Sequence, residues 1–580
     1  MNEFTEIKEY LDGRTWRRTE NANFNFSHSG LLAHVANKRM ADYALSIMPV
    51  RARKAHETGD IHIHKLETGM LIGYCHGGSL LGVLEGGVCS ADIRSNPAKH
   101  FSTALSHVTN YFFMSQLEWA GAQAFSDFDS LLAPFVYYDN LSRDQVKQDI
   151  QRMVWDLNFA CRQAFQTPFT NLTFNMGVPN YLKDKPVIVG GKFKKETYSD
   201  FIDEIELIND VFVEVISERD FYGRPFTFPI PTLNLTKKTD FNSETFRKIV
   251  DNTCENGSYF FMNYLGSGIN EDTVKAMCCR LNLDLSQLSS ARGTWNMGDG
   301  TGSLVCITLN MGRLGYRMKG KHFDLVLDEI KRLMIIVKSQ MLMQREMIQS
   351  RLKYNYLPFA KFYGINLDHY FNTIGVAGLN EFCMNYFGLP LSSCVEEAKK
   401  ILLYIRSVLK EFQIETGLLW NYEMPPIEGA SYRLARNDRE EFPDIFTLGT
   451  KAKPYYSSLL IPPSEDINLF ERINIEEQIL PLFSGGTACR IFLGEMRPDT
   501  DSMLSFIGKM VKTKIPYFDV AATYSICMDS IKKFNGVYYE CPECGKPADV
   551  YQRIVGYYRS ERKANAGKQQ EIADRLYTKI

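Results

Sequence analysis

Hydrophobic residues recur at helical spacing in four long stretches of the chain. Residues 27–60 form the first stretch, and its predicted apolar face consists of Leu31, Leu32, Val35, Met40, Tyr43 and Leu45. The second and third stretches cover about 98–120 and 143–165. The pattern is strongest over 321–352, because no glycine or proline interrupts residues 324–351. We therefore expect amphipathic helices in these four stretches.

Short runs of β-branched and aromatic residues separate the helical stretches. They cover 169–174, 227–235, 304–310 and 489–493, and such runs are typical of buried strands. Strands that alternate with helices over several hundred residues predict an α/β architecture. The periodicity does not fix the number of strands.

The composition favours a cytoplasmic enzyme that acts on a small molecule. The 580 residues are 45% hydrophobic and 23% charged, and the formal net charge is −2. This balance gives no electrostatic footprint for long nucleic acid. No run approaches the roughly 18 apolar residues of a membrane helix, and the first ten residues lack the apolar segment of a secretory signal. Thirteen cysteines, an odd number in a large chain, favour a reducing compartment.

The string Arg553-Ile554-Val555-Gly556-Tyr557, near the C-terminus, contains a residue type suited to holding a carbon radical. Loss of one α-hydrogen from glycine gives a planar radical, which the flanking amide nitrogen and carbonyl group stabilise. Glycine has no Cβ to crowd that plane. On its own the string is weak, because an ordinary turn glycine would explain it equally well.

Further sequence blocks favour the radical glycine over an ordinary turn glycine. They are Ile61-His62-Ile63-His64, residues 121–129 with Ala133-Pro134-Phe135, residues 166–171, residues 226–232, Met277-Cys278-Cys279-Arg280, Thr301-Gly302-Ser303, Glu428-Gly429 with Ser431-Tyr432-Arg433, Gly485-Gly486-Thr487, and residues 492–495. Together with Tyr557-Tyr558-Arg559, these ordered blocks make most of the chain similar to the oxygen-sensitive, class III (anaerobic) ribonucleoside-triphosphate reductases. That family belongs to the glycyl radical enzymes.

The resemblance implies a specific fold. We expect a ten-stranded α/β barrel made of two antiparallel half-sheets, with a finger-like loop through its centre. Residues 1–520 would form this catalytic barrel with its dimerisation helices. Residues 521–580 would form a C-terminal region with a zinc-knuckle-like cysteine cluster and the radical glycine. The His62-Ile63-His64 block comes too early for the N-terminal ATP-binding regulatory module of some relatives, so we expect the form that lacks it.

The resemblance also implies the reaction, which is the anaerobic reduction of ribonucleoside triphosphates to 2′-deoxyribonucleoside triphosphates for DNA synthesis. Gly556 would carry the glycyl radical, and Cys279, directly before Arg280, would become the thiyl radical at the tip of the finger loop. Cys75, in the glycine-rich segment 73–79, would be the second active-site cysteine. Without the resemblance, adjacent cysteines are most simply read as buried apolar residues, and we assign that structural role to Cys278.

Two further sites are weaker predictions. Glu428 matches a family glutamate near the substrate, where a carboxylate can act as a base or accept a hydrogen bond; a helix cap is the alternative. The segment Ser484-Gly485-Gly486-Thr487 offers free backbone N–H groups and two hydroxyl groups, which suit substrate phosphates. A tight turn would explain the same segment.

A cysteine cluster precedes the radical glycine. Cys541-Pro-Glu-Cys544 has the spacing of half a zinc site, and Cys527 would supply a third thiolate. The fourth ligand is missing from the pattern, because Ser530 stands where a cysteine or histidine would be expected; Asp529 or water could complete the set. A redox-active cysteine pair is the alternative.

The resemblance finally implies partners. We expect a separate activating enzyme that uses S-adenosylmethionine and an iron–sulfur cluster, a nucleotide effector, a homodimer, and formate or a thioredoxin-like protein as reductant. Lys65 departs from many relatives, which have an acidic residue there. Two rival interpretations remain: another glycyl radical enzyme, of the formate-lyase or diol-dehydratase type, and a non-catalytic zinc-knuckle protein.

Overall fold

The computed structural model describes residues 4–13, 22–90, 92–272, 274–277, 281–284, 300–494, 497–578 and 580. Its α-helices are α1 (Thr5–Leu11), α2 (His28–Ile47), α3 (Val50–Thr58), α4 (Leu80–Gly86), α5 (Phe101–Ser115), α6 (Phe128–Tyr138), α7 (Arg143–Asn158), α8 (Ile202–Ser217), α9 (Glu244–Glu255), α11 (Met311–Met318), α12 (Phe323–Lys353), α13 (Pro358–Phe362), α14 (Leu379–Tyr386), α15 (Val395–Thr416), α16 (Glu428–Glu441), α17 (Leu469–Ile479), α18 (Thr500–Met510) and α19 (Ala566–Ala573). In the described part of the chain, none of these helices is long and apolar enough to cross a bilayer.

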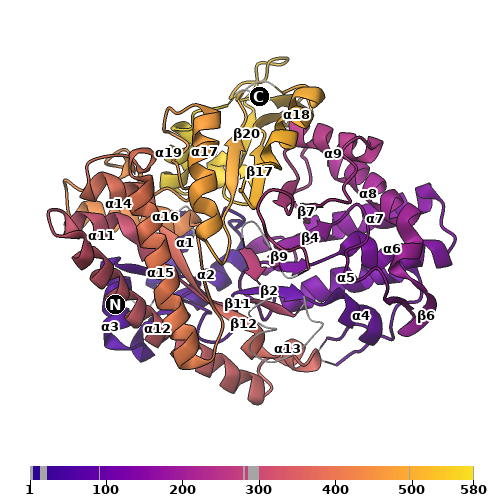
Figure 1. Cartoon of the computed structure of the whole chain (residues 1–580), viewed down its shortest axis with the longest axis horizontal. Coiled ribbons are helices and arrows are strands. Elements are labelled where there is room, and N and C mark those ends of the chain that lie inside the picture. Colours follow the sequence, from indigo (N-terminus) through magenta and orange to yellow (C-terminus); the bar gives the residue numbers. More distant parts are fainter. Residues whose placement is uncertain are drawn as a thin grey trace.

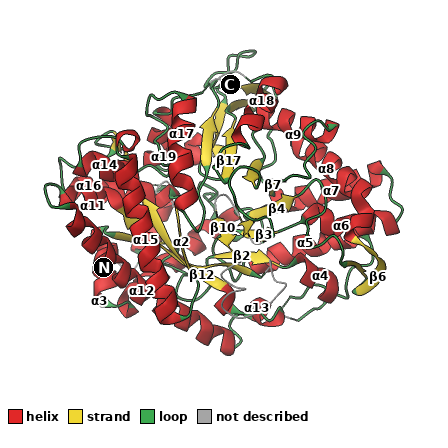
Figure 2. Ribbon diagram, viewed as in Figure 1, coloured by secondary structure: helices red, strands yellow, loops and turns green. Residues whose placement is uncertain are grey.

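A barrel of strands lies at the centre, with helices around it (Figures 1 and 2). Among the described residues its ten strands are β13 (Trp420–Glu423), β12 (Tyr370–Ala377), β11 (Thr301–Asn310), β2 (Cys75–Gly78), β3 (Gln123–Phe125), β4 (Thr170–Phe174), β7 (Ile230–Leu235), β8 (Phe260–Asn263), β17 (Tyr517–Ala521) and β16 (Cys489–Phe492), given in their order around the sheet. A short strand, β1 (Ile61–Ile63), pairs with the end of β11. Every residue of these ten strands, apart from one in β2, is buried, which explains why they read as continuous apolar or β-branched runs.

The strand directions divide the barrel into two halves. Strands β2, β3, β4, β7 and β8 are parallel to one another, and so are β17 with β16 and β13 with β12 and β11. The halves meet antiparallel at β11–β2 and at β8–β17. A parallel bridge between Glu423 and Gly486 joins β13 to the segment before β16 and closes the ring. The predicted barrel of two antiparallel half-sheets is therefore confirmed.

A hairpin of β9 (Val274–Met277) and β10 (Leu281–Asp284) lies against barrel strand β3. The expected finger loop falls in this part of the chain. Residues 278–280, which connect the two strands, lie outside the described residues.

The predicted strands and helices match the structure closely, with two exceptions. The run 27–60 is two helices, α2 and α3, because Pro49 ends the first and caps the second. The predicted apolar face of this run is also partly wrong: Leu32 is 59% exposed and Tyr43 is 44% exposed. Small residues such as Gly30 and Ala33 are buried instead.

The C-terminal part adds a four-stranded sheet to the barrel. Its order is β19 (Lys532–Asn535), β18 (Tyr524–Cys527), β20 (Asp549–Arg553) and β21 (Tyr558–Ser560). Two more hairpins lie elsewhere, β5 (Pro186–Val189) with β6 (Lys192–Thr197) and β14 (Leu448–Gly449) with β15 (Pro454–Tyr455). The division of the chain near residue 520 stays a prediction, although the sheet order changes between β17 and β18.

Candidate active site

Gly556 lies at the tip of a β-hairpin. Strands β20 and β21 pair through Arg553 and Tyr558, and the Ile554 N–H donates to the Tyr557 carbonyl at 2.9 Å. This bond leaves Val555 and Gly556 as the two turn residues. Gly556 is buried, in contrast to most hairpin turns, which lie at the surface.

The hairpin tip packs inside the barrel. Ile554, Val555 and Tyr557 form one apolar cluster with barrel residues, including Phe260 and Met262 of β8. The Tyr557 ring meets the Phe169 ring edge-on, with centroids 5.4 Å apart. The fold therefore carries a glycine from the end of the chain into the barrel and surrounds it with apolar side chains.

A cavity of about 130 Å³ lies beside the hairpin tip. It is lined by His62, His64, Lys65, Tyr74, Cys75, Ala120, Gly121, Ala122, Arg162, Phe169, Pro426, Ile427, Glu428, Gly429, Ala430, Val555 and Tyr557. Three of the predicted site features thus share one cavity: Cys75, Glu428 and the two neighbours of Gly556. They come from segments that are about 350 and 130 residues apart in the sequence.

Cys75 begins β2 and is only 5% exposed. Its thiol lies close to a neighbouring glycine, since a Cβ atom built on Gly121 would lie 2.6 Å from Cys75 Sγ. Any larger residue at position 121 would displace the thiol. The sequence at this point therefore makes room for a sulfur atom that faces the cavity.

Glu428 is the first residue of α16 and is 6% exposed. Its Oε2 accepts a hydrogen bond from the Tyr557 hydroxyl at 2.7 Å, and its Oε1 accepts one from the Ala22 N–H at 2.6 Å. Burial raises the pKa of this carboxyl to about 7, although both hydrogen bonds act to lower it. A carboxyl group that titrates near neutral pH and contacts the residue after Gly556 is suited to proton transfer.

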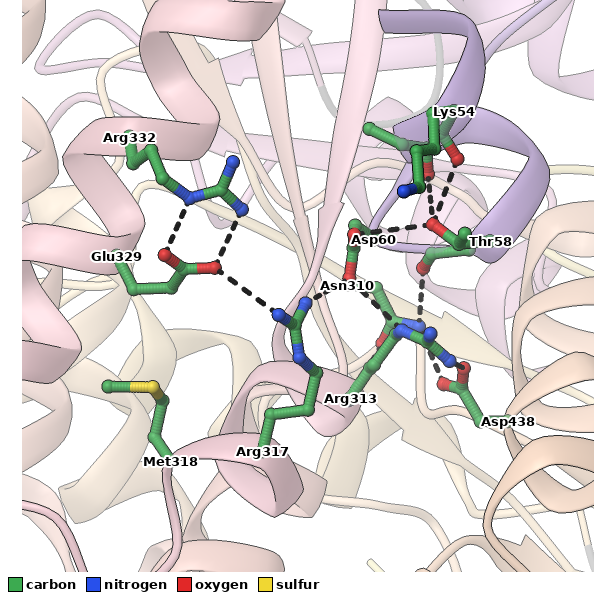
Figure 3. Close-up of polar contacts among 12 residues, drawn as sticks. Lys54, Thr58, Asp60, Asn310, Arg313, Arg317, Met318, Glu329, Arg332 and Asp438 are labelled. Atoms are coloured by element: carbon green, nitrogen blue, oxygen red, sulfur yellow. Dashed lines mark hydrogen bonds and ion pairs between the residues drawn. The ribbon is translucent and has the colours of Figure 1, made fainter. Parts of the chain in front are cut away.

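A partly buried ion-pair network fixes the helix that carries Glu428; Figure 3 shows this network. Asp438, ten residues further along α16, accepts hydrogen bonds from Arg313 Nη1 of α11 at 2.9 Å and from Asn310 Nδ2 at 2.7 Å. Asn310 is the last residue of β11. Arg313 also contacts Asp60 at 3.0 Å, and Arg317 approaches the same carboxylate at 2.8 Å. Because these groups join α16 to a barrel strand, they hold Glu428 in a defined position.

The segment 484–487 lies where β13 meets the approach to β16. The Gly485 N–H donates to the Tyr422 carbonyl at 2.7 Å, and the Gly486 carbonyl accepts from the Met424 N–H at 3.1 Å. The Ser484 hydroxyl accepts from the Tyr422 N–H at 3.3 Å. The Gly485 N–H and the Ser484 hydroxyl, two of the groups expected to contact phosphate, are therefore engaged in closing the barrel. Thr487 Oγ1 is buried and has no partner among the described residues, so phosphate contact by this segment stays a prediction.

The predicted thiyl residue, Cys279, and its neighbour Cys278 lie outside the described residues. The strands that flank them, β9 and β10, are paired in register from Met277 with Leu281 to Val274 with Asp284.

The cysteine cluster forms as predicted. One sulfur atom each from Cys527, Cys541 and Cys544 lies within 4.8 Å of the others, a spacing compatible with one tetrahedral ion. The Ser530 hydroxyl lies 3.6 Å from Cys541 Sγ, whereas the Asp529 carboxylate forms an ion pair with Lys546 at 2.7 Å. The donor set therefore fits zinc with three thiolates, and the identity of the fourth ligand stays a prediction.

Several cavity residues were not singled out from the sequence as site residues. His62, His64, Lys65 and Arg162 all line the cavity; burial lowers the pKa of His64 to about 4, so this imidazole is neutral near pH 7. The Ile61–His64 block already marked the two histidines as part of a motif. His76, in the glycine-rich segment 73–79, does not line the cavity. Its two ring nitrogens lie 2.7 and 2.6 Å from the hydroxyl groups of Tyr370 and Tyr111, so its contacts are structural.

Comparisons with known proteins agree with this geometry. A family model described as "Anaerobic ribonucleoside-triphosphate reductase" matches residues 20–577. The anaerobic ribonucleoside-triphosphate reductase of Escherichia coli (strain K12) is 23% identical, over 94% of this chain and 80% of the relative. The enzyme of the same name from enterobacteria phage T4 is 22% identical, over 94% of both chains.

Solved structures show the same fold. The anaerobic ribonucleotide reductase from Thermotoga maritima, in complex with dATP and CTP, has a TM-score of 0.75 at 21% identity and covers 97% of this chain and 98% of that one. A hydroxyproline dehydratase from Clostridioides difficile is less similar, with a TM-score of 0.61 at 10% identity. Neither the family model nor these curated relatives favour the rival interpretations. The chain therefore belongs to the anaerobic ribonucleoside-triphosphate reductase family.

Proposed function

We propose that Gly556 stores the radical of this reductase and that Cys279 and Cys75 use it on the substrate. The observation that supports this assignment is the shared cavity, which brings Cys75, Glu428 and both neighbours of Gly556 together inside the barrel. The burial of Gly556 suits a species that must be kept from water and dioxygen.

The proposed reaction begins outside this chain. A separate activating enzyme, which uses S-adenosylmethionine and an iron–sulfur cluster, removes one hydrogen atom from the Gly556 α-carbon. The glycyl radical then takes the hydrogen atom of the Cys279 thiol, and the resulting thiyl radical takes the hydrogen atom from C3′ of a ribonucleoside triphosphate.

Loss of the 2′-hydroxyl follows. Cys75 donates a proton to that hydroxyl, which leaves as water, while Glu428 accepts the proton of the 3′-hydroxyl. Formate or a thioredoxin-like protein then supplies two electrons, and hydrogen takes the place of the hydroxyl at C2′. Glu428 returns its proton to the 3′-oxygen, and Cys75 is reprotonated with a proton from the reductant or solvent. Cys279 finally returns a hydrogen atom to C3′ and regains its radical, which passes back to Gly556. The chain's contribution is to orient the reactants and to exclude solvent.

We also propose two binding functions beyond the reacting groups. The Thermotoga maritima relative was solved in complex with dATP and CTP, and with dATP in the specificity site. By similarity, this chain binds a nucleotide effector as well as its substrate, acts as a homodimer, and works in the cytoplasm. Cys527, Cys541 and Cys544 hold a structural zinc ion that stabilises the sheet from which the radical hairpin extends.

Electron paramagnetic resonance of the activated, oxygen-free protein tests the radical assignment. We expect a doublet from the wild type and no signal from Gly556→Ala. Cys279→Ser should keep the doublet and make no deoxynucleotide, because a serine O–H bond is too strong to relay hydrogen. Cys278→Ser is the matched control and should stay active. An active Cys279→Ser with an inactive Cys278→Ser would place the thiyl radical one residue earlier.

A further inference from the structure

Three buried residues connect the radical hairpin to the barrel wall. Arg490 lies on β16, Asp519 lies opposite it on β17, and Arg553 is the last residue of β20. Each is at most 2% exposed. Arg490 Nε donates to both oxygens of Asp519, at 3.0 and 2.9 Å, and Arg553 Nε lies 3.2 Å from Asp519 Oδ2.

The two arginines share one carboxylate, so one positive charge in this cluster is not balanced by Asp519. The guanidinium groups instead donate their remaining hydrogen bonds to backbone carbonyl groups. Arg553 Nη2 donates to the Gly257 carbonyl, and Arg490 Nη1 donates to the Val555 carbonyl. Buried guanidinium groups need such acceptors, because removing a charge from water is costly unless hydrogen bonds replace the lost hydration.

The Val555 carbonyl has a special position. It belongs to the peptide group whose nitrogen is the backbone nitrogen of Gly556. A glycyl radical is stabilised only while that peptide plane is aligned with the orbital on the α-carbon. A charge-assisted hydrogen bond from a rigid barrel strand holds the orientation of this plane.

A purely structural role does not account for all of the arginine's contacts. Strands β16 and β17 are already joined by their own ladder, and Arg553 already faces Asp519. The hydrogen bond from Arg490 Nη1 to the Val555 carbonyl is therefore not needed to hold these strands together.

We propose that Arg490 is a positioning residue for the radical: oriented by Asp519, it fixes the Val555–Gly556 peptide plane and thereby keeps the radical in its stabilised geometry. The inference rests on the proposed assignment of the radical to Gly556. Arginine suits this role better than lysine, because its planar fork can hold a carboxylate with one edge and a carbonyl with the other.

The test compares three variants of the full chain after anaerobic activation. Arg490→Gln removes the charge, and Arg490→Lys keeps it but loses the fork. Arg472→Gln is the matched control, because Arg472 is also buried in an ion pair, with Glu476 at 3.0 Å, and precedes the same strand. For each variant we would measure radical spins per chain, the doublet splitting from the remaining α-hydrogen, the zinc content and the thermal midpoint.

We expect Arg490→Gln to give at least about tenfold fewer spins, the loss that corresponds to one charge-assisted hydrogen bond. Its residual doublet should show an altered splitting, because the peptide plane is no longer fixed. Arg490→Lys should give an intermediate yield, and Arg472→Gln should match the wild type. If Arg490→Gln does not fold, the splitting in Arg490→Lys decides the matter, and an unaltered doublet at wild-type yield there overturns the inference.

The failure of this inference is distinguishable from the failure of the radical assignment. A doublet that persists in Gly556→Ala removes the assignment and this inference with it. A doublet that is lost in Gly556→Ala but unchanged in yield and splitting in a folded Arg490→Gln overturns the inference alone.

Discussion

Glu428→Gln is expected to remove a loss of stability that the wild type shows as the pH rises from about 4.5 to about 7. The glutamine side chain has the same shape as the glutamate side chain. Its amide oxygen can still accept from the Ala22 N–H, and its amide group can donate to the Tyr557 oxygen, so the contacts at 2.6 and 2.7 Å are retained in form. The variant loses only the ability to ionise.

The magnitude follows from the raised pKa of Glu428. Burial moves this pKa from 4.5 to about 7, so the folded protein binds the proton more tightly than the unfolded chain does. The free energy of unfolding therefore falls as pH rises from about 4.5 to about 7, and the full effect is present above pH 7. At about 1.4 kcal/mol per pH unit, the total change is about 3 kcal/mol.

The assay is thermal or urea unfolding of wild type and Glu428→Gln between pH 5 and 8. Relative to the wild type, the variant should gain stability as pH rises to about 7 and then level off. The turnover of the wild type should rise over the pH range in which its stability falls. The reason is that the carboxylate form of Glu428, which can accept a proton, predominates only above about pH 7. A stability difference that is constant across this range would refute the burial argument, and wild-type turnover with no inflection near pH 7 would refute the proton-transfer role.

Four other perturbations test separate parts of the structure. Air should cut the activated chain at Gly556, giving a large fragment that ends near residue 555 and a short tail; mass spectrometry should find unactivated protein and Gly556→Ala intact. Cys75→Ser should keep the radical doublet and make no deoxynucleotide in an anaerobic product assay. Cys541→Ser should release about one zinc ion per chain and lower the radical yield, as metal analysis and spin counting will show. Arg313→Ala leaves Asp438 buried without its cation and should lower the free energy of unfolding by about 3–5 kcal/mol, measured by denaturant titration.

The sequence predicts local structure well where one physical signal dominates. The β-branched run at 304–310 became the buried strand β11, Thr301–Asn310, and the uninterrupted pattern at 321–352 became α12, Phe323–Lys353. The face of α2 was predicted less well, because large apolar residues dominate a periodicity. The helix instead buries Gly30, Ala33 and Ala44, and small residues allow a close approach that a hydrophobic pattern does not register.

In the site, too, features set by local sequence could be predicted, whereas contacts between distant segments could not. The spacing of Cys541 and Cys544 made a metal knuckle predictable, and the structure brings Cys527 to it. Chain spacing gave no indication that Gly485 would donate its N–H to Tyr422, because that contact exists only when the barrel closes. Backbone groups in a glycine-rich segment look equally free whether they face a phosphate or a neighbouring strand.

The contacts around Gly556 show how a terminal hairpin can be held inside the barrel, where the proposed radical site lies. A two-residue turn has no strong preference for an interior position. Two hydrogen bonds made by the residues beside Gly556 hold this hairpin there. Tyr557 donates to Glu428 at the head of α16, and the Val555 carbonyl accepts from Arg490 on β16. Because one neighbour of the glycine is held by the start of a helix and the other by a barrel strand, both contacts together position the α-carbon. Loss of either contact should therefore loosen the proposed radical site before it unfolds the protein, whereas loss of the Asp438 network should unfold the protein first.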